Sequence, residues 1–430
     1  MKRFLLILIL IFNITLACTA DEQIKSQEDS SRYKINLQNA MQMALVGNIE
    51  LQEQRKNLGI SENDIKTANA LKNPQLQSNI LMGNIAKANS SQIGVSLPVE
   101  IMKRGARKKS AQAGMVYTIN KILDYEFKLK LRIRTAYFNL LLAKSNLKIM
   151  QDRKVLLEDL YEISKNKPQN TDNYQIELLQ ADMRLKKQLV QINKAKANVR
   201  TAQYNFNRVL NLENNLTLYD TIEDSFFDKS FVTNLELPSC EELEKIAFAN
   251  RYDIKMAEAK ILKAKNEINV ANKKRVPDVF VAGGYAFAQD GTPGAFVGAG
   301  LDMPVLYQYT PEIENAKLNY EKAQLEYNSI INITKNIIHT NHDKFIIAKE
   351  NVEHYQEIIE ESKEILKLSK QRYSKGKTAL TNLIVVEHSH QELLNEYVNA
   401  MGVYYNAYIS LLQEVGVDSF KMMKEKSENL

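Results

Sequence analysis

Two pairs of histidines come closest to metal-binding chemistry in this sequence. His339 and His342 stand three residues apart in a stretch that reads as helix, and His388 and His390 stand two residues apart. An i, i+3 pair can place two imidazoles on one helix face, but a closed zinc site has four ligands. Neither pair has a nearby cysteine or a clear third ligand, so the pattern is typical of a solvated helix face. We therefore predict no metal site and no cofactor.

A phosphate-binding loop and a catalytic triad are also excluded. Gly376-Lys377-Thr378 ends like a phosphate-binding loop, but Gln371 stands where that motif has its first glycine, and a helix precedes it instead of a strand. No nucleophile, base and orienting acid can be picked out. The net charge of +6 is spread as alternating Lys and Glu, which indicates solvated helices and no nucleic-acid partner. We predict that the protein is not an enzyme.

The first residues have the form of an export signal. Lys2-Arg3 precedes an apolar run at 4–12 that is too short to cross a bilayer. We expect a signal peptide at 1–17 and an N-terminal linker at 18–36. Leu16-Ala17-Cys18 resembles a lipobox, in which Cys18 is lipidated, and cleavage after Ala20 is the alternative. No later segment is apolar enough for a transmembrane helix, so any membrane-crossing part must consist of strands.

The sequence contains an internal duplication. Pro74-Gln75-Leu76 meets Pro277-Asp278-Val279 at an offset of 203 residues, and Pro98-Val99 meets Pro304-Val305 at an offset of 206. Solenoid repeats have periods of up to roughly 50 residues, so two half-subunits of a symmetric object are the better interpretation. We place the first repeat at 37–212, an equatorial linker at 213–239, the second repeat at 240–416 and a charged C-terminal tail at 417–430.

Each repeat contains two stretches in which apolar residues alternate with polar or small ones. This is the period of a strand with two unlike faces, and we predict strands at about 75–86, 91–101, 278–289 and 295–306. The face predicted to contact lipid carries Ile93, Val95, Leu97, Val281, Tyr285, Val297 and Leu301. Four such strands match the alternation of an outer-membrane barrel but cannot close one, so several copies must share it. Two soluble hairpins packed on a core are the alternative.

Long helices flank each pair of strands in the sequence. Only 8 prolines and 15 glycines interrupt the chain, which favours long elements. Apolar residues recur at the heptad spacing of a coiled-coil seam, as at Ile133, Leu140 and Leu147. We predict helices at about 37–71, 106–165, 174–210, 240–273, 311–373 and 379–415.

This order of elements resembles the TolC-type outer-membrane efflux proteins over about residues 37–416. Leu178-Leu179-Gln180-Ala181-Asp182 and Gln371-Arg372-Tyr373-Ser374-Lys375-Gly376 are similar to family segments near the two helix turns. The resemblance implies a mostly α fold with a small β part, in which a homotrimer forms one twelve-stranded β-barrel in the bacterial outer membrane, continued by a periplasmic α-helical barrel. It also implies a passive exit duct of a tripartite efflux system, coupled to an inner-membrane pump through a periplasmic adaptor protein.

Cargo and docking are finer expectations. The end of the second strand and the start of the next helix resemble a motif of the heavy-metal branch, which serves cobalt, zinc and cadmium pumps. The matching residues are Pro98-Val99-Glu100-Ile101 followed by Lys103-Arg104-Gly105-Ala106-Arg107, and Met102 replaces a glycine of the motif. Metal cations, drugs and proteins stay open as cargo. The adaptor is expected to dock at the second helix-turn tip, because exposed tips on rigid scaffolds carry binding. That tip comprises Tyr373, Ser374, Lys375 and Gly376. The rival hypothesis is an exported coiled-coil scaffold or adhesin lipoprotein without a pore.

Overall fold

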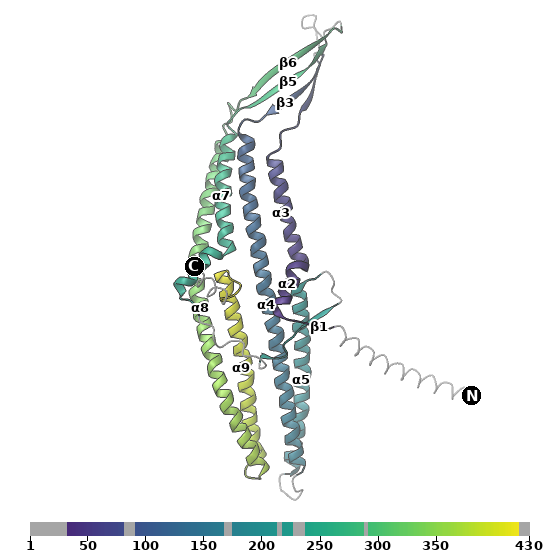
Figure 1. The fold of residues 1–430 in the computed structure, drawn as a ribbon, viewed down its shortest axis with the longest axis vertical. Coiled ribbons are helices and arrows are strands. Elements are labelled where there is room, and N and C mark those ends of the chain that lie inside the picture. The colour runs from purple at the N-terminus through teal and green to yellow at the C-terminus, as the bar shows by residue number, and fades with distance from the viewer. Residues whose placement is uncertain are drawn as a thin grey trace, which may run out of the picture. The chain divides into compact units, whose positions relative to one another are not determined.

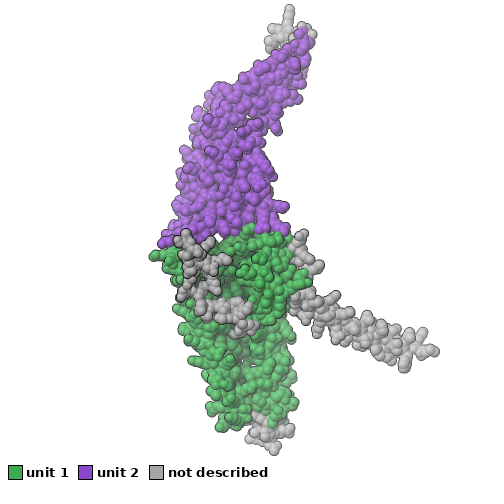
Figure 2. Space-filling model, in the orientation of Figure 1, with its two compact units in different colours: residues 1–51, 126–243, 337–430 green, residues 52–125, 244–336 purple. Residues whose placement is uncertain are grey.

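The computed structural model describes residues 32–80, 91–166, 174–212, 217–226, 237–287 and 291–420. The predicted signal peptide, Cys18, most of the first helix turn and most of the charged tail lie outside these residues. Within them the chain is mostly helical, with two small sheets. The chain divides into two compact units, coloured green and purple in Figure 2. Unit 1 comprises residues 1–51, 126–243 and 337–430, and unit 2 comprises 52–125 and 244–336.

Two long helices contribute residues to both units (Figure 1). α4 spans Lys103–Lys165 and α8 spans Thr310–Ser374, which are 63 and 65 residues. At 1.5 Å per residue each is roughly 95 Å long. Neither sequence contains a proline beyond the first turn, where Pro311 sacrifices no helical hydrogen bond. α5 (Tyr174–Leu210) and α9 (Leu380–Val415) follow these helices in the chain.

Unit 1 buries large apolar side chains from all four of these helices. Leu140 of α4, Phe206 of α5, Phe345 of α8 and Leu411 of α9 are completely buried. Their burial agrees with the heptad spacing, which places apolar residues on one stripe of each helix. Because burying one such side chain contributes about 1.5–3 kcal/mol, this core supplies much of the stability of unit 1.

A two-stranded parallel sheet in unit 1 joins segments at opposite ends of the first repeat. β1 (Arg32–Ile35) pairs with β4 (Leu218–Thr221). The Lys144 ammonium of α4 holds β4 by donating to Asp220, to Thr221 and to the Glu223 carbonyl over 3.0–3.3 Å. The linkers expected at 18–36 and 213–239 thus contain these strands, which are too short to show an alternating pattern.

The helix predicted ahead of each strand pair is broken in two, so the prediction of single helices was wrong. Residues 37–71 contain α2 (Leu37–Gly47) and α3 (Ile49–Ala68), and 240–273 contain α6 (Cys240–Asn250) and α7 (Tyr252–Lys273). The Asn48 side chain accepts from the Leu51 N–H and donates to the Leu210 carbonyl, both over 2.9 Å. At the second break, Arg251 pairs with Asp253. Polar side chains that bond to nearby groups compete with helical hydrogen bonds, which apolar periodicity does not reveal.

Unit 2 carries a four-stranded antiparallel sheet in the order β2-β3-β5-β6. The strands are β2 (Gln75–Ile80), β3 (Ser91–Val99), β5 (Asp278–Phe287) and β6 (Pro293–Asp302). β3 and β5, one from each predicted pair, lie side by side in Figure 1 and are in register from Ser91↔Phe287 to Val99↔Val279. β6 ends at Asp302, earlier than the predicted 306, because Pro304 has no N–H for the ladder.

Candidate functional site

The seven residues predicted to contact lipid lie on one face of the sheet in unit 2. Residues paired directly across antiparallel strands point to the same side. The register pairs Ile93 with Tyr285, Leu97 with Val281, Val95 and Val297 with Gly283, and Leu301 with Val279. All seven are exposed, from 43% for Leu97 to 87% for Val297. This sheet face therefore presents apolar side chains to whatever surrounds the chain.

The opposite face is mainly small and polar, with two aromatic exceptions. Its paired positions hold Gly, Ala, Ser, Gln and Asn along most of the sheet. Phe280 lies over Gly300 and Phe296 over Gly94, so closely that a Cβ on either glycine would overlap the ring. Covering a strand glycine with an aromatic ring shields the exposed backbone. The sequence alternation identified this face but gave no sign of the two phenyl rings.

Ion pairs fix the point at which the sheet of unit 2 meets its helices. Glu100, directly after β3, accepts from both terminal nitrogens of Arg107 at 2.6 and 2.7 Å, and the Lys72 ammonium lies 3.4 Å away. These Arg107 hydrogen bonds lower the pKa of the Glu100 carboxyl, and burial opposes them. Asp278 of β5 pairs with Lys103 at 2.8 Å and with Lys72 at 3.4 Å. Lys103 and Arg107 of the basic run therefore join strands to helices.

Both strand-to-helix connections in unit 2 pass through a left-handed residue. Met102 has a φ of 62° and Tyr309 a φ of 56°. This conformation costs a side-chain-bearing residue roughly 1–2 kcal/mol, whereas glycine adopts it freely. Met102 stands where the similar heavy-metal motif has glycine. The chain thus departs from that motif in residue type at a position whose backbone favours glycine.

The second helix-turn tip, in unit 1, exposes three of its four predicted docking residues. Ser374, Lys375 and Gly376 are exposed, and Gly376 has a φ of 68° with open space around its Cα. Tyr373 is only 1% exposed and packs in a cluster with Leu157, Leu160, Leu380, Leu383 and Ile384. Its hydroxyl lies 3.1 Å from the Ser164 hydroxyl. The Tyr373 side chain therefore packs inside the protein next to the tip and cannot contact a partner.

A buried ion pair in unit 1 was not identified from the sequence. Arg153 of α4 donates to Glu387 of α9 through Nε at 2.7 Å and Nη2 at 3.1 Å, and the Glu387 side chain is 2% exposed. A cavity of about 310 Å³ beside the pair is also lined by His390. The His390 Nδ1 lies 2.6 Å from the Ser362 hydroxyl, and burial lowers the pKa of this imidazole. The partners are 234 residues apart, so no local spacing could reveal them.

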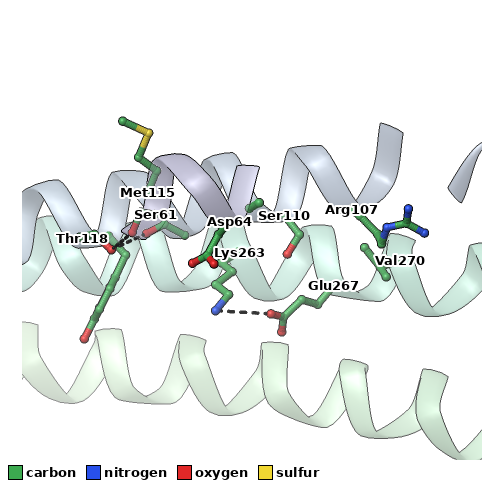
Figure 3. Close-up of a pocket in the computed structure, with 12 residues that line it drawn as sticks. Ser61, Asp64, Arg107, Ser110, Met115, Thr118, Lys263, Glu267 and Val270 are labelled. Atoms are coloured by element: carbon green, nitrogen blue, oxygen red, sulfur yellow. Dashed lines mark hydrogen bonds and ion pairs between the residues drawn. The ribbon is translucent and has the colours of Figure 1, made fainter. Parts of the chain in front are cut away.

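A polar cavity of about 430 Å³ lies between helices of unit 2 (Figure 3). Ser61 of α3 and Thr118 of α4 are hydrogen-bonded across it at 2.9 Å. Lys263 and Glu267 of α7 form an i, i+4 pair at 3.7 Å on another side. Small side chains such as Ser110 and Ala111 leave this space open. The lining supplies hydroxyls and charges of both signs, in no arrangement of nucleophile, base and orienting acid.

Two kinds of feature are absent from the described residues. Among them, no group of three or more His, Cys, Asp or Glu side chains could hold a metal ion. Across the same residues, no helix is long and apolar enough to span a membrane.

Comparisons with known proteins find relatives of about half of the chain. No family model matches it. Toxin and drug export protein A of Aggregatibacter actinomycetemcomitans is 24% identical over 224 residues, and an uncharacterized protein of Haemophilus influenzae is 24% identical over 209 residues. The chain spans about half the length of these curated relatives, since each alignment covers 45% of the relative, and 50% and 47% of this chain.

Solved outer-membrane channels match almost the whole chain. CmeC of Campylobacter jejuni has a TM-score of 0.71 at 17% identity, covering 92% of this chain and 90% of its own. MtrE of Neisseria gonorrhoeae has a TM-score of 0.73 at 17% identity, covering 89% of each chain. CusC has a TM-score of 0.73 at 15% identity, covering 89% of this chain and 92% of its own. The chain therefore has the fold of these solved outer-membrane channels.

Proposed function

We propose that this protein is the outer-membrane exit channel of a tripartite efflux system. The observation that carries the proposal is the sheet of unit 2, whose apolar face is exposed along its whole length. In lipid such a face is stabilised, and in water it would be an aggregation hazard. The fold shared with solved outer-membrane channels supports the same assignment.

The two edges of the sheet support assembly from several copies. β2 and β6 are the terminal strands of the four, so each leaves one row of backbone N–H and C=O groups unpaired within the sheet. In a bilayer every such group needs a hydrogen-bond partner. We propose that β6 of one copy pairs with β2 of the next and that three copies close a twelve-stranded barrel. The recurring order of elements in 37–210 and 240–415 supports two similar half-subunits in each copy.

The helices, in this proposal, extend the duct into the periplasm. The cargo is metal cations or drugs, delivered by an inner-membrane pump, and the protein itself is passive. A periplasmic adaptor docks at Ser374, Lys375 and Gly376, which are exposed at the end of α8. One relative is named for toxin and drug export, which supports drugs as the cargo.

Membrane retention combined with conductance tests the proposal. A channel should remain with outer membranes after high-salt and carbonate washing, and the purified protein should conduct ions in planar bilayers. The Cys18→Ser variant should behave in the same way, because spanning strands hold far more firmly than acyl chains. A protein that never conducts, and that leaves the membrane when Cys18 is changed, is the lipid-anchored scaffold instead.

A further inference from the structure

Six cations gather where the strands of unit 2 meet the helices. We call this set the basic belt: Arg104, Lys108, Lys109, Lys273, Lys274 and Arg275. Two contacts bring its members together from separate segments. The Lys273 ammonium lies 3.5 Å from the Met102 thioether, and the Asn266 amide of α7 donates to the Lys109 carbonyl over 3.4 Å. The end of α7 therefore lies beside the start of α4, and the belt is one surface.

Two acids at this junction, Glu100 and Asp278, pair with cations outside the belt. Glu100 binds Arg107 and Lys72, and Asp278 binds Lys103 and Lys72. Two carboxylates thus face three cations outside the belt. Lys274 of the belt also interacts with the Glu312 carboxylate at the start of α8, so the excess positive charge lies on the α4 members Arg104, Lys108 and Lys109.

The belt cations contact mainly neutral groups of the chain. Arg275 donates to the Gln308 carbonyl at 2.7 Å and the Thr310 hydroxyl at 3.2 Å, and Lys274 lies 5.8 Å from the centre of the Tyr309 ring. Across the described residues, no carboxylate lies within 4.0 Å of Arg104, Lys108 or Lys109. Such a concentration of unbalanced cations attracts an anionic partner.

Exposed apolar side chains flank the belt, either just before Arg104 or just before Gln308, whose carbonyl Arg275 contacts. They continue the apolar character of the strands beyond β3 and β6, at Ile101, Met102, Met303, Val305, Leu306 and Tyr307. Cations next to exposed apolar and tyrosine side chains are typical of the boundary between lipid tails and headgroups. A soluble anion or a nucleic acid would use the cations and leave the apolar side chains in water.

We propose that the basic belt binds the phosphate groups of anionic glycerophospholipids in the leaflet nearest the helices. The proposal rests on the proposed function, because it requires the strands to cross the membrane. The guanidinium of Arg104 can hold a phosphate through two parallel hydrogen bonds, and Lys108 and Lys109 add point charges. The apolar side chains contact the acyl chains of the same lipid.

Lipid retention by the purified full-length protein tests this inference. The protein is extracted with its lipids, offered phosphatidylglycerol or phosphatidylcholine, and the bound lipids are counted by native mass spectrometry. The test variant is Arg104→Gln/Lys108→Gln/Lys109→Gln. The matched control is Lys187→Gln/Lys194→Gln/Lys196→Gln, which removes three exposed cations from α5. Each cation near an anionic surface contributes about fivefold in affinity, so we expect the test variant to lose phosphatidylglycerol at least tenfold and the control to retain it.

Three outcomes would overturn the inference. The first is equal retention of the two lipids by the wild type, and the second is retention of phosphatidylglycerol by the test variant at the wild-type level. Displacement of the lipid by inorganic phosphate alone would show a simple anion site. Membrane retention and conductance of the same proteins separate the two proposals. Variants that insert and conduct but show no lipid preference contradict only the lipid inference, whereas a wild type that neither inserts nor conducts contradicts both.

Discussion

The two units differ in where they place their apolar side chains. Unit 1 buries them within one chain, as Leu140, Phe345 and Leu411 show, each with no exposed surface. In unit 2, Ala271, Ile313 and Ala316 form a small buried cluster, and the strand residues Val297 and Leu301 are 87% and 58% exposed. Because exposed apolar surface is costly in water, the proposed channel requires lipid and further copies to cover the strand face of unit 2.

This contrast extends to charges. In unit 1, Arg153 and Glu387 form a pair in which the carboxylate is 2% exposed. In unit 2, the Glu100 carboxylate is 8% exposed, and its partners Arg107 and Lys72 are 33% and 48% exposed. Substitutions in the core of unit 1 should therefore change the stability of the folded chain, and substitutions on the strand face of unit 2 should change assembly in the membrane.

The largest expected effect is that of Glu387→Ala. It leaves the Arg153 guanidinium partly buried without its carboxylate, which costs roughly 3–5 kcal/mol. The matched control is Glu158→Ala, which removes an exposed i, i+4 pair with Lys154 and should cost about 0.5 kcal/mol or less. Denaturant unfolding followed by circular dichroism measures both. Equal losses of stability would mean that the Arg153–Glu387 pair contributes no more than a surface pair.

The next largest effect is expected for a charged substitution on the apolar face of the sheet in unit 2. Val95→Arg places a cation on the apolar face of β3, which costs about 2–4 kcal/mol if that face meets the middle of a bilayer. Gln92→Arg places the same cation on the opposite face of the same strand. We expect the amount of membrane-inserted oligomer to fall for Val95→Arg and to be unchanged for Gln92→Arg. Identical loss for the two variants would contradict the assignment of the faces.

Two glycines of the sheet should respond differently to the same change. A Cβ at Gly284 would overlap the Ile93 carbonyl and the Gly94 Cα of the paired strand, whereas Gly298 has open space. Gly284→Ala should therefore force β3 and β5 apart and cost about 1–3 kcal/mol. Gly298→Ala should be tolerated. The yield of folded, protease-resistant oligomer distinguishes the variants, and tolerance of both would show that β3 and β5 pair less closely.

Features with a local period were predictable from the sequence. Strand alternation needs only neighbouring residues, so the face of Val95 and Leu97 could be assigned before the register was known. The heptad spacing of Ile133, Leu140 and Leu147 likewise lies within a predicted helix at 106–165, and α4 spans Lys103–Lys165. The contacts that were missed depend on residues far apart in the chain. Phe296 covers Gly94, and the hydroxyls of Tyr373 and Ser164 meet across 209 positions.

The breaks between paired helices were missed for another reason. Asn48 and Arg251 sit within apolar patterns that continue on both sides, so periodicity alone predicts one helix. The Asn48 side chain caps the following helix by accepting from the Leu51 N–H, and Arg251 pairs with Asp253 at the other break. The docking role of Tyr373 was inferred from its place at a turn, where burial could not be judged without the packing of Leu380 and Leu383.

A smaller effect, in the stabilising direction, is expected at the strand–helix junction of unit 2. Met102→Gly removes the strain of a side-chain-bearing residue in the left-handed conformation. It should stabilise the folded protein by about 1 kcal/mol. Met303→Gly is the control, because Met303 is also exposed but has no positive φ. Met303→Gly should not increase the stability of the folded protein. Thermal unfolding of the two variants tests the point, and a loss of stability for Met102→Gly would show that contacts of the Met102 side chain outweigh the strain.

The smallest expected effect is a pH dependence that separates the two units. Burial lowers the pKa of His390 from its ordinary 6.5, with Glu387 opposing and Lys363 adding to the shift. The unfolded chain therefore binds a proton at a higher pH than the folded chain does. Stability is full above about pH 6.5 and falls as the pH drops through that value towards the lower folded pKa.

Glu100 in unit 2 should respond only in stronger acid. Its pKa is lowered from 4.5, chiefly by the hydrogen bonds from Arg107, so its contribution persists at pH 5 and disappears below about 4.5. We expect the melting temperature to fall between about pH 8 and about pH 5 in the wild type, and the fall to shrink in His390→Gln. His388→Gln, which changes an exposed neighbour, should keep the wild-type slope. If His390→Gln kept that slope as well, the imidazole beside Ser362 would not be the group that titrates, and the acid sensitivity of unit 1 would have to come from its carboxylates.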